Sequence, residues 1–311
     1  MQVLFLDEVH PILQDKLEKA GVQCRHDYSS KGAELHQVLG DYDGVVIRSR
    51  VPVDRAFFEA AHQLKFIARS GAGLENIDLV LAKEFGVEVF HSPEGNRRAV
   101  AEHAIMLMLM LLNHAKRGDA EVRDGQWNRE KNRGKELANC TVGVVGYGYM
   151  GKELVEVLKG FGAALLVHDK YLSGFGDDRI REVSLDELRA ESDIISLHLP
   201  ENEETHHYVN AAFIEQVSKP FYLINTARGK NVSLEAVVNG LASGKLLGAG
   251  LDVLEVEKRS FEGIASNPWL QTLLDDERVV FSPHVAGWTQ ESYVKLSDVL
   301  FDKIEAAFLK Q

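Results

Sequence analysis

The fold is decided by the stretch Thr141-Val-Gly-Val-Val-Gly146-Tyr-Gly148-Tyr-Met-Gly151, which is followed, after a helix-compatible segment, by Ala164-Leu-Leu-Val-His-Asp169. The first apolar run suits a buried parallel strand. The glycines have the spacing G-x-G-x-x-G. Gly146 permits a tight turn, Gly148 leaves the backbone open to a pyrophosphate, and Gly151 lets the helix approach the strand closely. The stretch therefore predicts a dinucleotide-binding unit, with an ordinary α/β turn as the alternative.

The residues around the glycines also indicate which dinucleotide is bound. The helix that begins near Tyr149 and Met150 offers backbone N–H groups and a partial positive charge to the phosphates. Asp169 follows about twenty residues later and can accept hydrogen bonds from a ribose 2′-hydroxyl. Its charge would repel a 2′-phosphate, so NAD is predicted rather than NADP.

Composition limits the class of protein. A length of 311 residues suggests about two domains, and a formal charge of −12 argues against non-specific nucleic-acid binding. The two cysteines, Cys24 and Cys140, have no metal-ligand spacing, which predicts neither a metal site nor a disulfide and suits a cytoplasmic protein. The N-terminus lacks the features of a signal peptide. The most apolar run, residues 104–112, is too short to cross a membrane.

Short apolar runs alternate with amphipathic segments along the chain, which predicts an α/β fold with doubly wound parallel sheets. Strands are expected at residues 3–6, 45–48, 66–68 and 87–90, and then at 194–199, 221–225, 249–253 and 279–281. Helices are expected at residues 11–20, 34–39, 55–63, 79–85 and 99–112.

Two Ser-Pro segments suggest crossings between two domains. The first is His91-Ser-Pro-Glu-Gly-Asn96, which contains proline and glycine, and the second is Ser282-Pro-His284. We therefore expect a Rossmann NAD-binding domain at residues 96–287, inserted in a flavodoxin-like substrate domain. Residues 1–95 would form that domain, and residues 288–311, including a helix at 290–309, would complete it.

Three polar residues follow predicted strands of the second half: Arg228, Glu257 and His284. Ligands bind at that edge of an open parallel sheet. A histidine can take the hydroxyl proton when hydride leaves a 2-hydroxy acid, a carboxylate can orient it, and an arginine can hold the substrate carboxylate. Each residue alone also has a structural interpretation, and the combination favours catalysis.

Over nearly its whole length the chain resembles the D-isomer-specific 2-hydroxyacid dehydrogenase family, through the glycine fingerprint, Asn225-Thr-Ala-Arg228-Gly229, Gly250-Leu-Asp252-Val-Leu…Glu257 and Ser282-Pro-His284-Val-Ala-Gly287-Trp288. The resemblance implies that Arg228, Glu257 and His284 are catalytic, and that a cleft separates two α/β domains. It implies a homodimer built on helix 99–112. It also implies cofactor contacts from Thr226, Ala227, Asp252, His284 and Gly287, and substrate contacts from Ser70, Gly71, Ala72, Gly73 and Asn96.

Within the family, Ile47-Arg-Ser-Arg50, Asn96-Arg-Arg-Ala-Val-Ala-Glu102 and Gly125-Gln-Trp-Asn128 are most similar to the phosphoglycerate dehydrogenases. The resemblance implies NAD-linked interconversion of 3-phosphoglycerate and 3-phosphohydroxypyruvate in serine biosynthesis. Arg48 and Arg50 are the expected phosphate ligands, Arg50 more than Arg48, unless both are surface arginines.

Other interpretations remain open. Glyoxylate or hydroxypyruvate reduction is the alternative activity, and an NAD(H)-sensing corepressor on the same fold is the alternative class. Lys258 stands where the family commonly has proline, and Ser233 where it commonly has aspartate. Since the sequence stops at Gln311, no C-terminal regulatory domain is expected.

Overall fold

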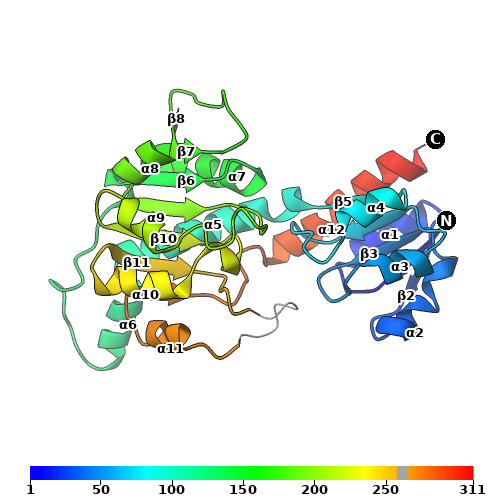
Figure 1. Ribbon diagram of the computed structural model, residues 1–311, viewed down its shortest axis with the longest axis horizontal. Coiled ribbons are helices and arrows are strands. Elements are labelled where there is room, and N and C mark those ends of the chain that lie inside the picture. The colour runs from blue at the N-terminus through cyan, green and yellow to red at the C-terminus, as the bar shows by residue number, and fades with distance from the viewer. Residues whose placement is uncertain (258–264, 311) are drawn as a thin grey trace. The chain divides into compact units, whose positions relative to one another are not determined.

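The computed structural model describes residues 1–257 and 265–310, so Lys258 lies outside the described residues. The chain divides into two compact units: unit 1 consists of Met1–Asn96 with Trp288–Gln311, and unit 2 of Arg97–Gly287. Each unit contains one wholly parallel sheet with helices, which confirms the predicted α/β class (Figure 1). Among the described residues, no helix is long and apolar enough to span a membrane.

Unit 1 is built on a five-stranded sheet with the order β2-β1-β3-β4-β5, which is the flavodoxin-like order. Its strands are β1 (Gln2–Phe5), β2 (Gln23–His26), β3 (Gly44–Ile47), β4 (Phe66–Arg69) and β5 (Glu88–His91). Its helices are α1 (Ile12–Lys19), α2 (Gly32–His36), α3 (Arg55–Ala60), α4 (Leu79–Glu84) and α12 (Gln290–Ile304), with a 3₁₀ turn η1 (Leu39–Asp41) and a final π-helical turn η5 (Glu305–Leu309).

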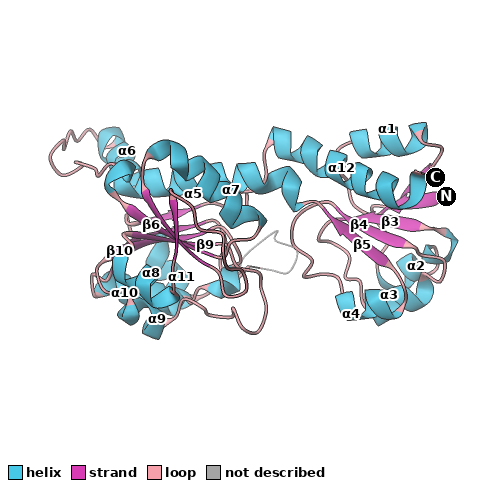
Figure 2. Ribbon diagram, turned by 90° about the horizontal axis from the view of Figure 1, so that it is seen from above, coloured by secondary structure: helices cyan, strands magenta, loops and turns pink. Residues whose placement is uncertain are grey.

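Different helices cover the two faces of this sheet (Figure 2). Helices α1 and α12 pack on one face through buried side chains that include Leu13 and Leu300. Helices α2, α3 and α4 cover the other face, where Leu35, Phe57 and Ala82 are buried. Full burial of a Leu or Phe side chain contributes about 1.5–3 kcal/mol. The last helix therefore supplies part of the core of unit 1.

Unit 2 contains a seven-stranded sheet with the order β12-β11-β10-β9-β6-β7-β8. Its strands are β6 (Thr141–Val145), β7 (Ala164–His168), β8 (Ile180–Glu182), β9 (Ile194–Leu197), β10 (Phe221–Asn225), β11 (Leu246–Leu251) and β12 (Val279–Phe281). Its helices are α6 (Ala115–Arg123), α7 (Tyr149–Leu158), α8 (Leu185–Glu191), α9 (Ala211–Gln216), α10 (Leu234–Ala242) and α11 (Pro268–Leu274), with 3₁₀ turns η2 (Leu137–Asn139), η3 (Lys159–Phe161) and η4 (Gly229–Asn231). Strand order reverses beside β6, and such a switch point is where doubly wound sheets bind ligands.

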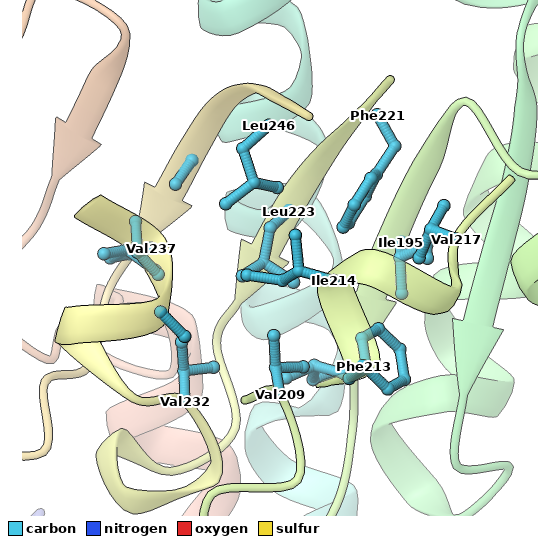
Figure 3. Packing of buried hydrophobic residues seen from close by; sticks show 14 of the residues in the cluster. Ile195, Val209, Phe213, Ile214, Val217, Phe221, Leu223, Val232, Val237 and Leu246 are labelled. Carbon is cyan, nitrogen blue, oxygen red and sulfur yellow. The ribbon is translucent and has the colours of Figure 1, made fainter. Parts of the chain in front are cut away.

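The sheet of unit 2 lies between two layers of helices (Figure 2). Helix α5 (Pro93–Leu112) and helix α7 pack on one face through residues such as Leu107 and Leu154. Helices α8 to α11 cover the other face. There Phe213 and Ile214 of α9 pack against strand residues including Leu223 (Figure 3). Burial on both faces explains why these strands appear in the sequence as short, nearly continuous apolar runs.

Three details differ from the sequence-based expectations. Strands β2 and β8 were not predicted, because both are edge strands with mostly exposed side chains and no apolar run. The helix expected at residues 99–112 begins earlier, at Pro93 within the predicted domain crossing, since proline is well accommodated in the first turn of a helix. The last helix changes at Glu305 from an α-helix into a π-helical turn.

Candidate active site

Three neighbouring strands of unit 2 bring the predicted catalytic residues to one edge of the sheet. Arg228 follows β10, Glu257 follows β11 and His284 follows β12, and these strands are adjacent and parallel. Their carboxyl ends therefore share the edge at which open α/β sheets bind ligands.

His284 and Glu257 form a hydrogen-bonded pair. Nδ1 of His284 lies 2.7 Å from Oε2 of Glu257, and both side chains are largely buried. The other carboxylate oxygen of Glu257 accepts a hydrogen bond from the backbone N–H of Leu254. With Nδ1 donating to the carboxylate, Nε2 becomes the basic nitrogen of a neutral His284 ring. The pair has the geometry of a histidine base oriented by an acid.

A network of backbone and amide hydrogen bonds holds the turn that carries Arg228. Asn225 Nδ2 donates to the Arg228 carbonyl over 2.9 Å, and the Arg228 N–H donates to Oδ1 of buried Asn231 over 3.1 Å. The neighbouring Gly229 approaches the turn before Glu257 so closely that a Cβ atom would lie 2.0 Å from the Leu254 carbonyl oxygen. Glycine is therefore required where the two turns meet.

The glycine-rich loop has the geometry that a pyrophosphate site needs. Gly146 has a φ of +96°, and a Cβ atom on Gly151 would lie 2.0 Å from the Gly146 carbonyl oxygen. A Cβ on Gly148 would meet no atom within 4 Å, so the space in front of the loop is open. Helix α7 has no side-chain cap at Gly148. The first N–H groups of α7, from Tyr149 and Met150, therefore remain available to phosphate oxygens.

Asp169 lies directly after β7 and is bound to the glycine-rich loop. One carboxylate oxygen accepts the N–H of Tyr147 over 2.7 Å, and the other accepts the N–H groups of Tyr171 and Leu172, each over 2.9 Å. Burial by itself would raise the pKa of Asp169, but these three bonds outweigh it and lower the pKa. The carboxylate is thus kept ionised beside the glycines, where the predicted ribose contact requires it.

The other predicted cofactor residues lie at the same edge of the sheet. Thr226 and Ala227 follow β10, and Oγ1 of Thr226 is buried with no hydrogen-bond partner among the described residues. Buried Asp252 follows β11, and Gly287 lies in the loop between β12 and α12. Three features fit a large polar cofactor such as NAD. They are the unpaired hydroxyl of Thr226, the open space at Gly148 and the uncapped start of helix α7.

The predicted carboxylate-binding loop of unit 1 offers fewer backbone N–H groups than expected. The N–H of Ser70 donates to the Ile47 carbonyl over 2.8 Å, and that of Gly71 donates to Ser92 Oγ over 3.2 Å. Within the described part of the chain, the N–H groups of Ala72 and Gly73 have no such partner. These two remain candidates for substrate binding. Buried Oδ1 of Asn96, in the first turn of α5, also lacks a partner among the described residues.

The contacts of the two arginines favour Arg48 over Arg50 as the anion ligand, contrary to the expected order. The guanidinium of Arg50 donates to Asp7 Oδ1 over 3.0 Å, and to three carbonyl oxygens of unit 1, so four of its five N–H groups are engaged. The guanidinium of Arg48 instead stacks on the ring of Trp288, 4.2 Å from the centroid. Burial lowers the pKa of Arg48, although Asp7 opposes the shift. Arg50 is a structural cation, and Arg48 is the better candidate for binding an anion.

Sequence reasoning missed several supporting residues. Asn231 and Ser92 fix loops of the site through side-chain hydrogen bonds, but an isolated Asn or Ser carries no sequence signal. Ser233 departs from the commoner aspartate, yet its side chain caps α10 by accepting the N–H of Ala236 over 3.3 Å. Since serine and aspartate are comparable N-caps, this departure preserves the local structure.

The chain was compared with known proteins. The family model for the NAD-binding domain of D-isomer specific 2-hydroxyacid dehydrogenases matches residues 105–286. The hydroxypyruvate reductase of Thermotoga maritima is 36% identical over 271 residues, covering 87% of this chain and 86% of that protein. The D-3-phosphoglycerate dehydrogenase of Archaeoglobus fulgidus is 32% identical over 306 residues, covering 98% of this chain and 56% of that protein. The crystal structure of D-lactate dehydrogenase from Aquifex aeolicus, complexed with NAD and lactic acid, has a TM-score of 0.83 and 28% identity, covering 98% of this chain and 95% of that one.

The fold and the site define an NAD-dependent oxidoreductase. The chain belongs to the D-isomer-specific 2-hydroxyacid dehydrogenase family, as its motifs indicated, and NAD is its cofactor. The chain spans only about half the length of the archaeal relative. The three relatives are named for different substrates, so similarity alone does not identify the acid on which this enzyme acts.

Proposed function

We propose that Arg228, Glu257 and His284 catalyse the reversible oxidation of a D-2-hydroxy acid to its 2-oxo acid. The observation that carries this proposal is the 2.7 Å contact between His284 Nδ1 and Glu257 Oε2. With Nδ1 bound to Glu257, Nε2 of His284 would accept the proton of the C2 hydroxyl during oxidation and return it during reduction. NAD, when bound, would supply the acceptor for the hydride that leaves C2.

Arg228 would bind and polarise the reacting end of the substrate. A guanidinium can donate two parallel hydrogen bonds to a carboxylate, or one to a carboxylate and one to the C2 oxygen. The turn that holds Arg228 is fixed by Asn225 and Asn231. Such preorganised donors favour the negative charge that develops on the substrate oxygen.

We further propose 3-phosphoglycerate and 3-phosphohydroxypyruvate as the substrate pair, which would place the enzyme in serine biosynthesis. The supporting feature is Arg48, a half-buried guanidinium stacked on Trp288 and located directly after β3. A phosphate near a partly desolvated guanidinium forms charge-assisted hydrogen bonds. Loss of this contact would cost about 2–3 kcal/mol, or roughly thirty- to a hundredfold in kcat/KM.

The test compares Arg48→Met with the wild type on 3-phosphoglycerate and on D-glycerate. Methionine keeps an apolar stem over Trp288 and removes the charge. We expect the large loss only for the phosphorylated acid. Arg55→Ala is the control, because Arg55 is an exposed arginine of the same unit that pairs with Glu84. Equal losses on both acids, or no loss on either, would remove the support for a phosphorylated substrate.

Hydroxypyruvate reduction is the second candidate. It is favoured by the engagement of Arg50 within unit 1, which leaves one arginine fewer for a phosphate than the sequence suggested. It also agrees with the similarity to the bacterial hydroxypyruvate reductase over 86% of that protein. A higher kcat/KM for hydroxypyruvate than for 3-phosphohydroxypyruvate would establish this activity.

We also propose that the enzyme is a cytoplasmic homodimer. Both cysteines are free thiols, which suits a reducing compartment. The side chains of Met106 on α5, Val122 on α6 and Trp127 are exposed, and a second copy would cover these apolar groups. Light scattering coupled to size exclusion should give the mass of two chains. Trp127→Glu should shift the enzyme toward the monomer.

A further inference from the structure

A chain of hydrogen bonds leads from helix α5 to the loop that carries His284. Nε2 of His103 lies 2.7 Å from Oγ of Ser282, and the Ser282 hydroxyl donates to Oδ1 of Asp252 over 2.6 Å. Because the serine proton is given to Asp252, Nε2 of His103 must be the donor to Ser282. The donors therefore point in one direction along the chain, from His103 to the carboxylate.

Asp252 holds the loop around His284 through several hydrogen bonds. Its carboxylate accepts the N–H groups of Val285 and Ala286, each over 2.9 Å, and its backbone carbonyl accepts the N–H of His284 over 2.8 Å. Its side chain is almost completely buried. A carboxylate held by this many donors has essentially one orientation, so the loop has one conformation.

The backbone of His284 needs this support. His284 has a φ of +55°, in the left-handed region that residues with a Cβ atom rarely occupy. Such a conformation persists only where the surrounding structure imposes it, and it is common at active sites. The contacts of Asp252 on both sides of His284 supply that constraint, and they place Nδ1 within reach of Glu257.

We infer that His103 is a positioning residue for His284, acting through Ser282 and Asp252 to hold the catalytic ring in its productive place. The inference rests on the proposed role of His284, and it does not depend on which 2-hydroxy acid is the substrate. Burial lowers the pKa of His103, although the charge of Asp252 opposes the shift. The ring is therefore a neutral N–H donor at neutral pH, as the first donor in the series of hydrogen bonds to Asp252 must be.

Three variants test the inference. His103→Leu removes the donor, His103→Gln restores an N–H donor of similar reach, and Ser282→Ala breaks the same chain from the loop side. We expect His103→Leu and Ser282→Ala to lower kcat about tenfold each, since small displacements of a reacting group are costly. The Kd for NAD should stay within about twofold. His103→Gln should recover most of the loss.

A matched control separates positioning from packing. Met108 lies on the same helix and is buried in the same core as its neighbours. Met108→Ala should lower the melting temperature and leave kcat nearly unchanged. If Met108→Ala lowers kcat as much as His103→Leu does, or if His103→Gln is no better than His103→Leu, His103 is only a packing residue.

Double mutants identify the residue on which His103 acts. In the His284→Asn background, adding His103→Leu should cause no further loss of the residual rate, because the ring to be positioned is gone. A further tenfold loss would overturn the inference. Near-normal turnover by His284→Asn alone would instead refute the proposed catalytic role of His284, so the two failures are distinguishable.

Discussion

Asp169 is expected to determine the choice between NAD and NADP, and Asp169→Asn tests this. The carboxylate is ionised and held beside Tyr147 of the glycine-rich loop, directly after β7. Asparagine has nearly the same shape. It removes the charge that would repel a 2′-phosphate, and it would weaken the proposed hydrogen bonds to the ribose hydroxyls of NAD.

The magnitude follows from two contributions. Two unit charges about 4 Å apart near a protein surface repel by about 4 kcal/mol at an effective dielectric constant of about 20, and less where water screens them. Relief of about 2 kcal/mol of this repulsion would improve kcat/KM for NADP roughly thirtyfold. Weaker ribose contacts would reduce kcat/KM for NAD about tenfold. The ratio of the two efficiencies should therefore shift by about 10²–10³.

Initial rates with both cofactors measure this ratio directly. Asp177→Asn is the control, since Asp177 is an exposed acid on the segment that follows Asp169. Its ratio should match that of the wild type. If Asp169→Asn changes the ratio by less than about threefold, Asp169 is not the residue that discriminates between the cofactors.

Three other perturbations probe the supporting structure. Burial lowers the pKa of His198 to about 4. As the pH falls, His198 is therefore protonated in the unfolded chain before it is protonated in the folded protein. Stability should decline by about 3 kcal/mol between about pH 6.5 and pH 4, and His198→Phe should flatten that part of a urea-unfolding series. Arg50→Ala should lower the free energy of unfolding by about 2–3 kcal/mol through the loss of Asp7 and carbonyl contacts, with little change in substrate selectivity. Gly229→Ala should lower kcat at least about tenfold, because its Cβ would meet the Leu254 carbonyl oxygen and displace a catalytic turn.

The sequence predicted the parts of the fold that rest on local patterns. Buried parallel strands such as β6 and β10 are continuous apolar runs, and the glycine spacing at 146–151 reflects steric needs that the structure displays. Edge strands β2 and β8 carry mostly exposed side chains, so no periodicity marks them. The same limit applies to α5, whose first turn resembles a loop because it contains proline and glycine.

The sequence could predict which residues belong to the candidate site, but it could not predict most of the contacts that those residues make. Arg48 and Arg50 differ by two positions and look equivalent in the sequence. Only the fold shows that the second is surrounded by Asp7 and by carbonyl groups from the loops after β1 and β2. The His103 contact with Ser282 joins residues 179 positions apart. Such pairs depend on the whole chain topology, which local sequence patterns do not encode.

Whether His284 transfers the substrate proton is tested by the turnover and the cofactor affinity of His284→Asn. With the acid that the wild type oxidises best, we expect a kcat lower by about 10²–10⁴-fold, as is typical when a positioned acid–base group is lost. The Kd for NAD, measured by the quenching of protein fluorescence, should remain within about twofold of the wild-type value. A variant that keeps near-wild-type kcat would show that His284 does not transfer the substrate proton, and the proposed mechanism would be wrong.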